Sequence, residues 1–328
     1  MIDNPILVKQ QSKKKSETKR NIYLLFSILL GLFLIYPDDI TWARDRLNYL
    51  TYADSSWVIM QSYLNDSILS FLTNEPLFLL INIILSSFLS PENIVKFIIF
   101  LSTVIVLYSL GKLTNYNFFV LILFLLLPQI VKNHVIHLRQ GLALSIYLLG
   151  LVNNQKRYGS ILKYLSVFIH SSFIFLILFE FLEKILKKIK FNFTVRILFS
   201  AVFLILFIQL IPNLALLFGD RRSLVYDFSI AESASGLGFL MWLVMGTLFI
   251  LVVKKDYINT IACYGIVFYL LSYFFLDFSA RIFENIIPLI LVGVLNIQNI
   301  YLKFLFILFF IFYGCLTWYS GGGLNFLM

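Results

Sequence analysis

Short polar clusters interrupt an otherwise apolar chain and hold the side chains that could do chemistry. His170 lies deep in an apolar stretch, where an ionisable side chain is a functional candidate. Because histidine titrates near neutrality, His170 could act as an acid, a base or a phosphate donor. Arg139 begins another apolar run, and its planar guanidinium could bind a phosphate through two hydrogen bonds. The plainer alternatives are a histidine satisfied within the core and an arginine that snorkels to a membrane boundary.

The stretch from Pro37 to Tyr49 alternates acids, arginines and aromatic residues. Aromatic rings stack on sugar faces and acids accept hydrogen bonds from hydroxyl groups, so this composition favours carbohydrate binding. The alternative is an interfacial loop with an aromatic belt and solvated charges. The candidate sugar-binding residues are Asp38, Asp39, Arg44 and Tyr49.

Two later clusters place arginines beside acids. Arg221 and Arg222 follow Asp220, a pattern that fits a clamp for phosphate or an acidic sugar, or simply a solvated loop. Arg281 lies three residues before Glu284, so these two side chains could pair within one helix turn.

The sequence contains no signature of a bound cofactor. It has no Walker sequence, no nucleotide-binding glycine pattern and no zinc motif, so we expect no cofactor. His134 and His137 could share a helix face, but no third ligand lies nearby in the sequence, so we expect no metal site. Cys263 and Cys315 fall in apolar runs and are interpreted as small buried hydrophobic residues.

Membrane helices are the elements that must position these clusters. The chain is 60% hydrophobic and 13% charged, whereas soluble domains carry about 25% charged residues. Its mean hydropathy is +0.90. Continuous rather than alternating apolar runs favour helices over barrel strands. We expect an all-α polytopic membrane protein of about 9–11 transmembrane helices, with re-entrant or broken segments. Four runs lack Asp, Glu, Lys and Arg altogether: 197–219, 233–253, 257–276 and 304–328.

The chain is interpreted as one transmembrane domain with a short tail at each end. Residues 1–20 form a basic tail, residues 21–320 form the domain with external loops near 37–76 and 219–235, and residues 321–328 form the second tail. The basic tail predicts a cytoplasmic N-terminus. The formal charge of +9 fits this bias and contact with anionic lipid, and we expect no nucleic-acid partner.

Two segments leave the topology of the first half open. If Leu77–Ser90 and Ser160–Glu183 both cross, Arg139 lies inside and Asn153–Gly159 lies outside. If both are re-entrant or broken, Arg139 and His170 lie outside. The second arrangement puts most lysines inside, as the positive-inside rule requires. It also puts six of the nine arginines outside, which favours an anionic ligand there: Arg44, Arg46, Arg139, Arg221, Arg222 and Arg281.

The order of these motifs resembles the bacterial O-antigen and exopolysaccharide polymerases of the Wzy/EpsG type. The likeness is clearest at Arg139-Gln140-Gly141-Leu142-Ala143 and at Phe168-Ile169-His170-Ser171-Ser172. Arg44-Asp45-Arg46-Leu47-Asn48-Tyr49 matches the early Asp and Tyr of the family loosely, without the usual glycine before the Asp. The resemblance spans about residues 37–290.

The resemblance implies a fold like that of the multi-spanning, lipid-linked-donor (GT-C-like) glycosyltransferases. Such enzymes join oligosaccharide repeat units carried on undecaprenyl pyrophosphate, at the outer face of the inner membrane. The implied partners are the glycan donor and acceptor, membrane lipid, and the flippase and chain-length regulator of the same pathway. Arg139 and Arg281, helped by Arg221 or Arg222, would bind the pyrophosphate. The candidate catalytic residues are His170, Arg139, Asp45 and Glu75, where the last two are rival general bases.

Two other functions remain open at this point. A glycosyltransferase that uses a polyprenyl-phosphate monosaccharide would also carry acids such as Asp38 and Asp39 in its first external loop. A transporter or flippase of lipid-linked sugars should show inverted repeats, and the sequence shows no such symmetry.

Overall fold

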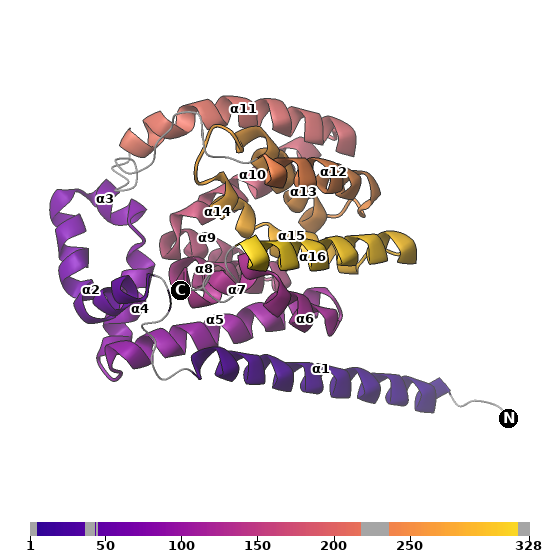
Figure 1. The fold of residues 1–328 in the computed structure, drawn as a ribbon, viewed down its shortest axis with the longest axis horizontal. Coiled ribbons are helices and arrows are strands. Elements are labelled where there is room, and N and C mark those ends of the chain that lie inside the picture. Colours follow the sequence, from indigo (N-terminus) through magenta and orange to yellow (C-terminus); the bar gives the residue numbers. More distant parts are fainter. Residues whose placement is uncertain (1–4, 37–42, 44, 218–235, 321–328) are drawn as a thin grey trace.

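A computed structural model describes residues 5–36, 43, 45–217 and 236–320, and these ranges contain helices and no β-strand (Figure 1). The predicted all-α polytopic class is confirmed. Among the described residues, four helical stretches are long and apolar enough to cross a membrane. The remaining apolar segments form shorter or broken helices, and the bent pair Pro128–Val135 and Leu138–Val152 counts as a fifth stretch if it is taken as one span. The four stretches are Ser16–Ile35 of α1 (Pro5–Ile35), α5 (Pro91–Leu113), Phe193–Ile211 of α11 (Phe193–Leu217) and α16 (Ile300–Ser320).

Helix α5 is the central support of the first half. Helix α1 lies along one side of it (Figure 1), where Tyr23 donates a hydrogen bond to the Leu107 carbonyl at 3.1 Å. Gly111 permits this approach, because a Cβ there would lie 2.5 Å from the Tyr23 ring. Helix α8 (Leu138–Val152) also packs on α5, and its Ser145 hydroxyl donates to the Ser102 carbonyl at 2.7 Å.

Apart from α2, the other helices are shorter than these four stretches. Several helices carry a proline in their first turn, where its missing N–H leaves no donor unsatisfied. Prolines open α4, α5, α7 and α15. In Figure 1, α2 to α4 lie at one end of α5. The bounds are α2 (Arg46–Asp66), α3 (Ile68–Thr73), α4 (Pro76–Ser86), α6 (Phe119–Leu126), α7 (Pro128–Val135), α9 (Arg157–Ile169), the 3-10 turn η1 (Ser171–Phe173), α10 (Ile174–Lys188), α12 (Leu237–Val252), α13 (Tyr257–Ser272), α14 (Ser279–Glu284) and α15 (Ile287–Leu295).

The segment around His170 turns back on itself. Lys163 of α9 and Glu180 of α10 form an ion pair at 2.6 Å, which requires the chain to bend back at His170 rather than continue as one straight helix. Helix α4 is only 11 residues long, or roughly 16 Å at 1.5 Å per residue, well short of a hydrocarbon core about 30 Å thick. Both observations favour the second sequence arrangement, in which neither segment crosses fully.

Interrupted helices meet at one place in the molecule. One break lies at Glu75 between α3 and α4, and another lies between α7 and α8, which are bent by 108° just before Arg139. A third lies at His170, where the backbone is extended between α9 and η1. The side chains at these three breaks contact one another, so the breaks define the candidate site.

Candidate functional site

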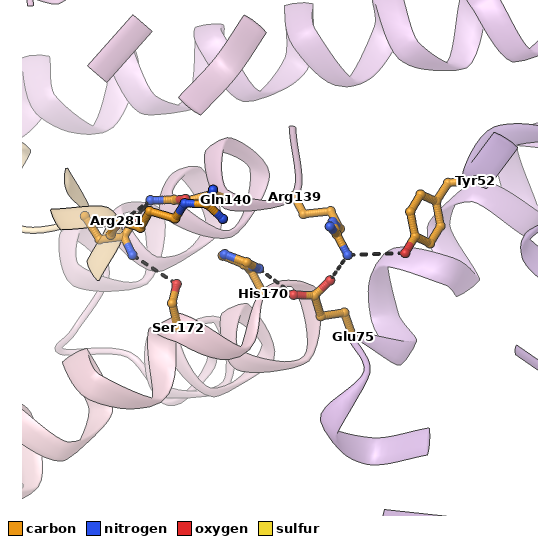
Figure 2. Close-up of polar contacts among 8 residues, drawn as sticks. Tyr52, Glu75, Arg139, Gln140, His170, Ser172 and Arg281 are labelled. Carbon is orange, nitrogen blue, oxygen red and sulfur yellow. Dashed lines mark hydrogen bonds and ion pairs between the residues drawn. The ribbon is translucent and has the colours of Figure 1, made fainter. Parts of the chain in front are cut away.

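Glu75 is the centre of the site. It is only 2% exposed, and its backbone is left-handed, with φ of 63°. A residue other than glycine rarely adopts this conformation, which costs on the order of 1–3 kcal/mol and is concentrated at functional sites. The strain turns the chain between α3 and α4, and Pro76 then opens α4. The carboxylate therefore points toward α8 and the His170 turn rather than along α4 (Figure 2).

Arg139 binds Glu75 through one side of its guanidinium. Its Nη1 donates to Oε2 of Glu75 and lies 3.4 Å from the Tyr52 hydroxyl, as drawn in Figure 2. The guanidinium carbon lies 5.0 Å from the centre of the Tyr52 ring and 5.9 Å from that of the Tyr49 ring, within range of cation–π attraction. Two rings and one carboxylate thus fix the arginine.

Close packing of α8 against α7 places Arg139 at this point. A Cβ on Gly141 would lie 2.1 Å from the Asn133 carbonyl oxygen, so no side chain fits there. The backbone N–H groups of Ile136 and His137 both donate to the Lys132 carbonyl and end α7. The chain then turns sharply and starts α8 one residue before Arg139.

His170 contacts the other oxygen of Glu75. Its Nδ1 lies within hydrogen-bonding distance of Oε1, while Oε2 is bound by Arg139. An ionised carboxylate can only accept hydrogen bonds, so the contact requires a proton on Nδ1. When the imidazole is neutral, Nε2 is then the basic nitrogen. The arrangement of carboxylate and imidazole is that of a general base whose tautomer is fixed by an acidic neighbour.

A second chain of hydrogen bonds runs beside the first. Gln140 donates to the Arg281 carbonyl and to the Asn285 side chain, both at 2.9 Å. Asn285 in turn donates to the Ser172 hydroxyl at 3.1 Å. Figure 2 shows His170 between this chain and Glu75. The late part of the sequence is thereby attached to α8 and to the His170 turn.

A second ion pair lies in the same region. Lys132 of α7 binds Glu284 of α14, whereas Arg281, whose spacing allowed a pair with Glu284, acts on this carboxylate as a nearby charge. Nearby, Nδ1 of His137 lies 3.8 Å from Oδ2 of Asp45. Asp45 is the last residue before α2 and is exposed, so this contact marks the outer edge of the site.

Of the candidate catalytic residues, the structure brings Glu75, Arg139 and His170 into contact. Asp45 lies at the edge, beside His137, and the side chain of Arg281 is exposed. Tyr49 is 6% exposed and packs beside Arg139, so its ring is not an open stacking surface here. The remaining candidates, Asp38, Asp39, Arg44, Arg221 and Arg222, lie outside the described residues.

His134 and His137 do not act as a pair. His134 is fully buried and its Nδ1 lies 3.0 Å from the Ser102 hydroxyl, whereas His137 lies beyond the end of α7 and faces Asp45. Among the described residues, no group of three or more His, Cys, Asp or Glu side chains is placed to hold a metal ion.

Sequence reasoning missed several members of this site. The candidates drawn from the sequence do not include Tyr52, Lys132 or Asn285, and they include Gln140 only as a residue within the Arg139 motif. Lys132 could have been found, because it is an ionisable residue at the end of an apolar run. Tyr52 and Asn285 carry no such signal, because their roles depend on contacts across the fold.

The site combines three side chains that could take part in a reaction. They are His170 held by the Glu75 carboxylate, Arg139 bound to the same carboxylate, and the exposed Arg281. Such a set can take a proton from a hydroxyl group while stabilising negative charge on a leaving group.

Comparison with known proteins identifies the family of this chain. The EpsG family matches residues 12–328, nearly the whole chain. No curated protein and no solved structure matches significantly. Because the family match covers far more than half of the sequence, the chain belongs to the EpsG family, whose members are membrane proteins of the polysaccharide-polymerase type.

Proposed function

We propose that this protein polymerises oligosaccharide repeat units carried on undecaprenyl pyrophosphate into O-antigen, capsule or exopolysaccharide. The observation that carries the proposal is the Glu75 carboxylate held between Arg139 and His170 in a chain of the EpsG family. The energy for the transfer is already stored in the activated diphosphate of the donor. An enzyme of this kind needs a base for the acceptor hydroxyl and cations for the leaving group.

The step is a displacement at the anomeric carbon of the donor chain. Nε2 of His170 takes the proton of an acceptor hydroxyl as that oxygen forms the new glycosidic bond. The bond between the anomeric carbon and the diphosphate oxygen breaks, and the diphosphate leaves with its electron pair. Arg139 and Arg281 neutralise the charge that develops on it. Arg221 or Arg222 would add to this charge stabilisation.

Glu75 is the positioning carboxylate in this proposal rather than the base. Its two oxygens already bind Arg139 and His170, and pairing with a guanidinium makes a carboxylate a weaker base. Asp45 stays the rival base, because it is exposed and lies 3.8 Å from Nδ1 of His137. The sugar contacts are assigned to the stretch before α2, with Asp38, Asp39 and Arg44, while Tyr49 within α2 packs beside Arg139.

The proposal puts the reaction at the outer face of the bacterial inner membrane, with a cytoplasmic N-terminus. The lysine-rich first segment supports this orientation. The return of the chain at His170 also supports it, because Arg139 and His170 then share one end of α8 while the basic segment near Lys156 lies at the other.

The test is deletion of the gene followed by gel analysis of the cell's surface polysaccharide. We expect the ladder to collapse to the lipid core plus a single repeat unit, and to return with the wild-type gene but not with Arg139→Ala. Arg157→Ala, which changes an exposed arginine at the start of α9, is the matched control and should restore the ladder.

Other outcomes would contradict the proposal. Loss of every repeat unit, including the single one, would indicate a monosaccharide transferase or a flippase instead. An unchanged ladder would exclude all three functions. A full ladder from the Arg139→Ala gene would remove Arg139 from the site.

A further inference from the structure

Cationic side chains converge on one residue of this site. Lys132, Arg139 and Arg281 all lie close enough to His137 to act on it electrostatically. Like charges that are brought together repel one another, and the repulsion is stronger where water is partly excluded. Such a cluster is stable only with counter-charges around it, so the position of the carboxylates decides what the cluster can bind.

Two of those carboxylates lie behind the cations. The side chain of Glu75 is 2% exposed and that of its partner Arg139 is 20% exposed. The side chain of Glu284 is 7% exposed and that of its partner Lys132 is 15% exposed. In both pairs the carboxylate is the more deeply buried partner, so the exposed part of each pair belongs mainly to the side chain of the cationic residue.

The two pairs also lie on either side of one bend. Lys132 belongs to α7 and Arg139 to the first turn of α8, and these helices meet at 108°. Arg281 is attached to the same place, because its carbonyl accepts a hydrogen bond from Gln140, the residue after Arg139. The three cations thus come from α7, α8 and α14, and all three lie near His137.

We propose that Lys132 is a further diphosphate-binding residue, held in place by Glu284 as Arg139 is held by Glu75. This inference rests on the proposed function only in that the ligand is the diphosphate of a lipid-linked sugar. A diphosphate presents two phosphate groups to the site. A guanidinium binds one of them through two hydrogen bonds, and an ammonium group serves as a point charge for the other.

Direct binding to the purified full-length protein in detergent tests this role. The probes are farnesyl diphosphate and inorganic pyrophosphate, titrated by calorimetry. We expect Lys132→Met to weaken farnesyl diphosphate binding by about tenfold or more, the scale of one lost charged contact, and Lys132→Arg to keep most of the affinity. Lys254→Met is the matched control, because Lys254 is exposed and lies at the opposite end of α13 from α14.

Removing Lys132 alone leaves Glu284 as an uncompensated buried charge, which could unfold the protein. The double variant Lys132→Met with Glu284→Gln removes both charges and should fold while still binding the diphosphate weakly. Wild-type affinity in either variant would overturn the inference, as would the absence of binding by the wild-type protein. If pyrophosphate binds as tightly as farnesyl diphosphate, the diphosphate alone is recognised; tighter binding of the farnesyl compound adds a lipid contact.

The result can be separated from that of the proposed function. If diphosphate binding depends on Lys132 but deletion of the gene leaves the polysaccharide ladder unchanged, the diphosphate site is supported and the polymerase activity is contradicted. If the ladder collapses but the substitution of Lys132 leaves diphosphate binding unchanged, the polymerase activity is supported and Lys132 is not part of the diphosphate site.

Discussion

Glu75 and His170 lie 95 residues apart in the chain and meet through Oε1 and Nδ1. Neither residue belongs to a regular helix, because Glu75 precedes α4 and His170 separates α9 from η1. Their contact turns two helix interruptions into one site, and Arg139 completes it by binding the second oxygen of Glu75.

The first prediction concerns the charge of Glu75. Glu75→Gln keeps the shape of the side chain but can no longer fix the tautomer of His170 or balance Arg139. We expect polymer formation to fall by about 10²–10⁴-fold, the range lost when a general base or the residue that orients it is disabled. The measurement is polymer yield per unit of membrane-inserted protein, with Glu92→Gln, an exposed glutamate in the first turn of α5, as the control.

Glu75→Asp tests the reach of the side chain rather than its charge. Aspartate keeps the charge but is one methylene shorter, so it should not reach both Arg139 and His170 from the same backbone position. We therefore expect polymer formation to fall in this variant as well. A Gln variant as active as wild type would show that the charge of Glu75 has no part in the reaction.

The second prediction concerns the approach of α8 to α7. A Cβ at Gly141 would lie 2.1 Å from the Asn133 carbonyl, so Gly141→Ala must push the start of α8 away. We expect lower thermal stability and loss of activity together, because Arg139 moves with that turn. Gly238→Ala is the control, since its nearest neighbour is the end of the Tyr269 side chain at 3.1 Å. Equal melting temperatures for wild type and Gly141→Ala would contradict this account.

The third prediction concerns the buried pair Lys163 and Glu180. Both side chains are at most 4% exposed, and Glu180 also accepts a hydrogen bond from Tyr147 at 2.9 Å. Lys163→Met leaves the carboxylate without its cation and should destabilise the protein by about 3–5 kcal/mol. Adding Glu180→Leu removes the charge left behind and should recover most of the loss, as read from thermal unfolding in detergent. A double variant less stable than Lys163→Met would sink the ion-pair explanation.

The fourth prediction concerns orientation. After both native cysteines are replaced by serine, a cysteine at exposed Asn48 should react with a membrane-impermeant maleimide in spheroplasts. A cysteine at exposed Gln155, beside Lys156, should react only after the membrane is opened. The physical reason is the retention of lysine-rich segments on the cytoplasmic side. The reverse pattern would invert the topology and put the site at the inner face.

Much of the fold class was readable from composition. An apolar chain with few charges must satisfy its backbone hydrogen bonds within helices, so an all-α membrane protein followed directly. His170 and Arg139 were also identified from sequence, because an ionisable residue beside or within an apolar run is costly and seldom accidental.

What only the tertiary structure decided is which of these residues work together. The sequence offers Glu75 and His170 only as separate candidates and does not relate Lys132 to Glu284 at all, because the members of each pair lie far apart in the chain. The local spacing of Arg281 and Glu284 allowed a pair within one helix turn, but it could not show that Glu284 binds Lys132 across helices. Short-range periodicity describes neighbours on one helix, whereas helix breaks and close packing at Gly141 determine which charges meet in space.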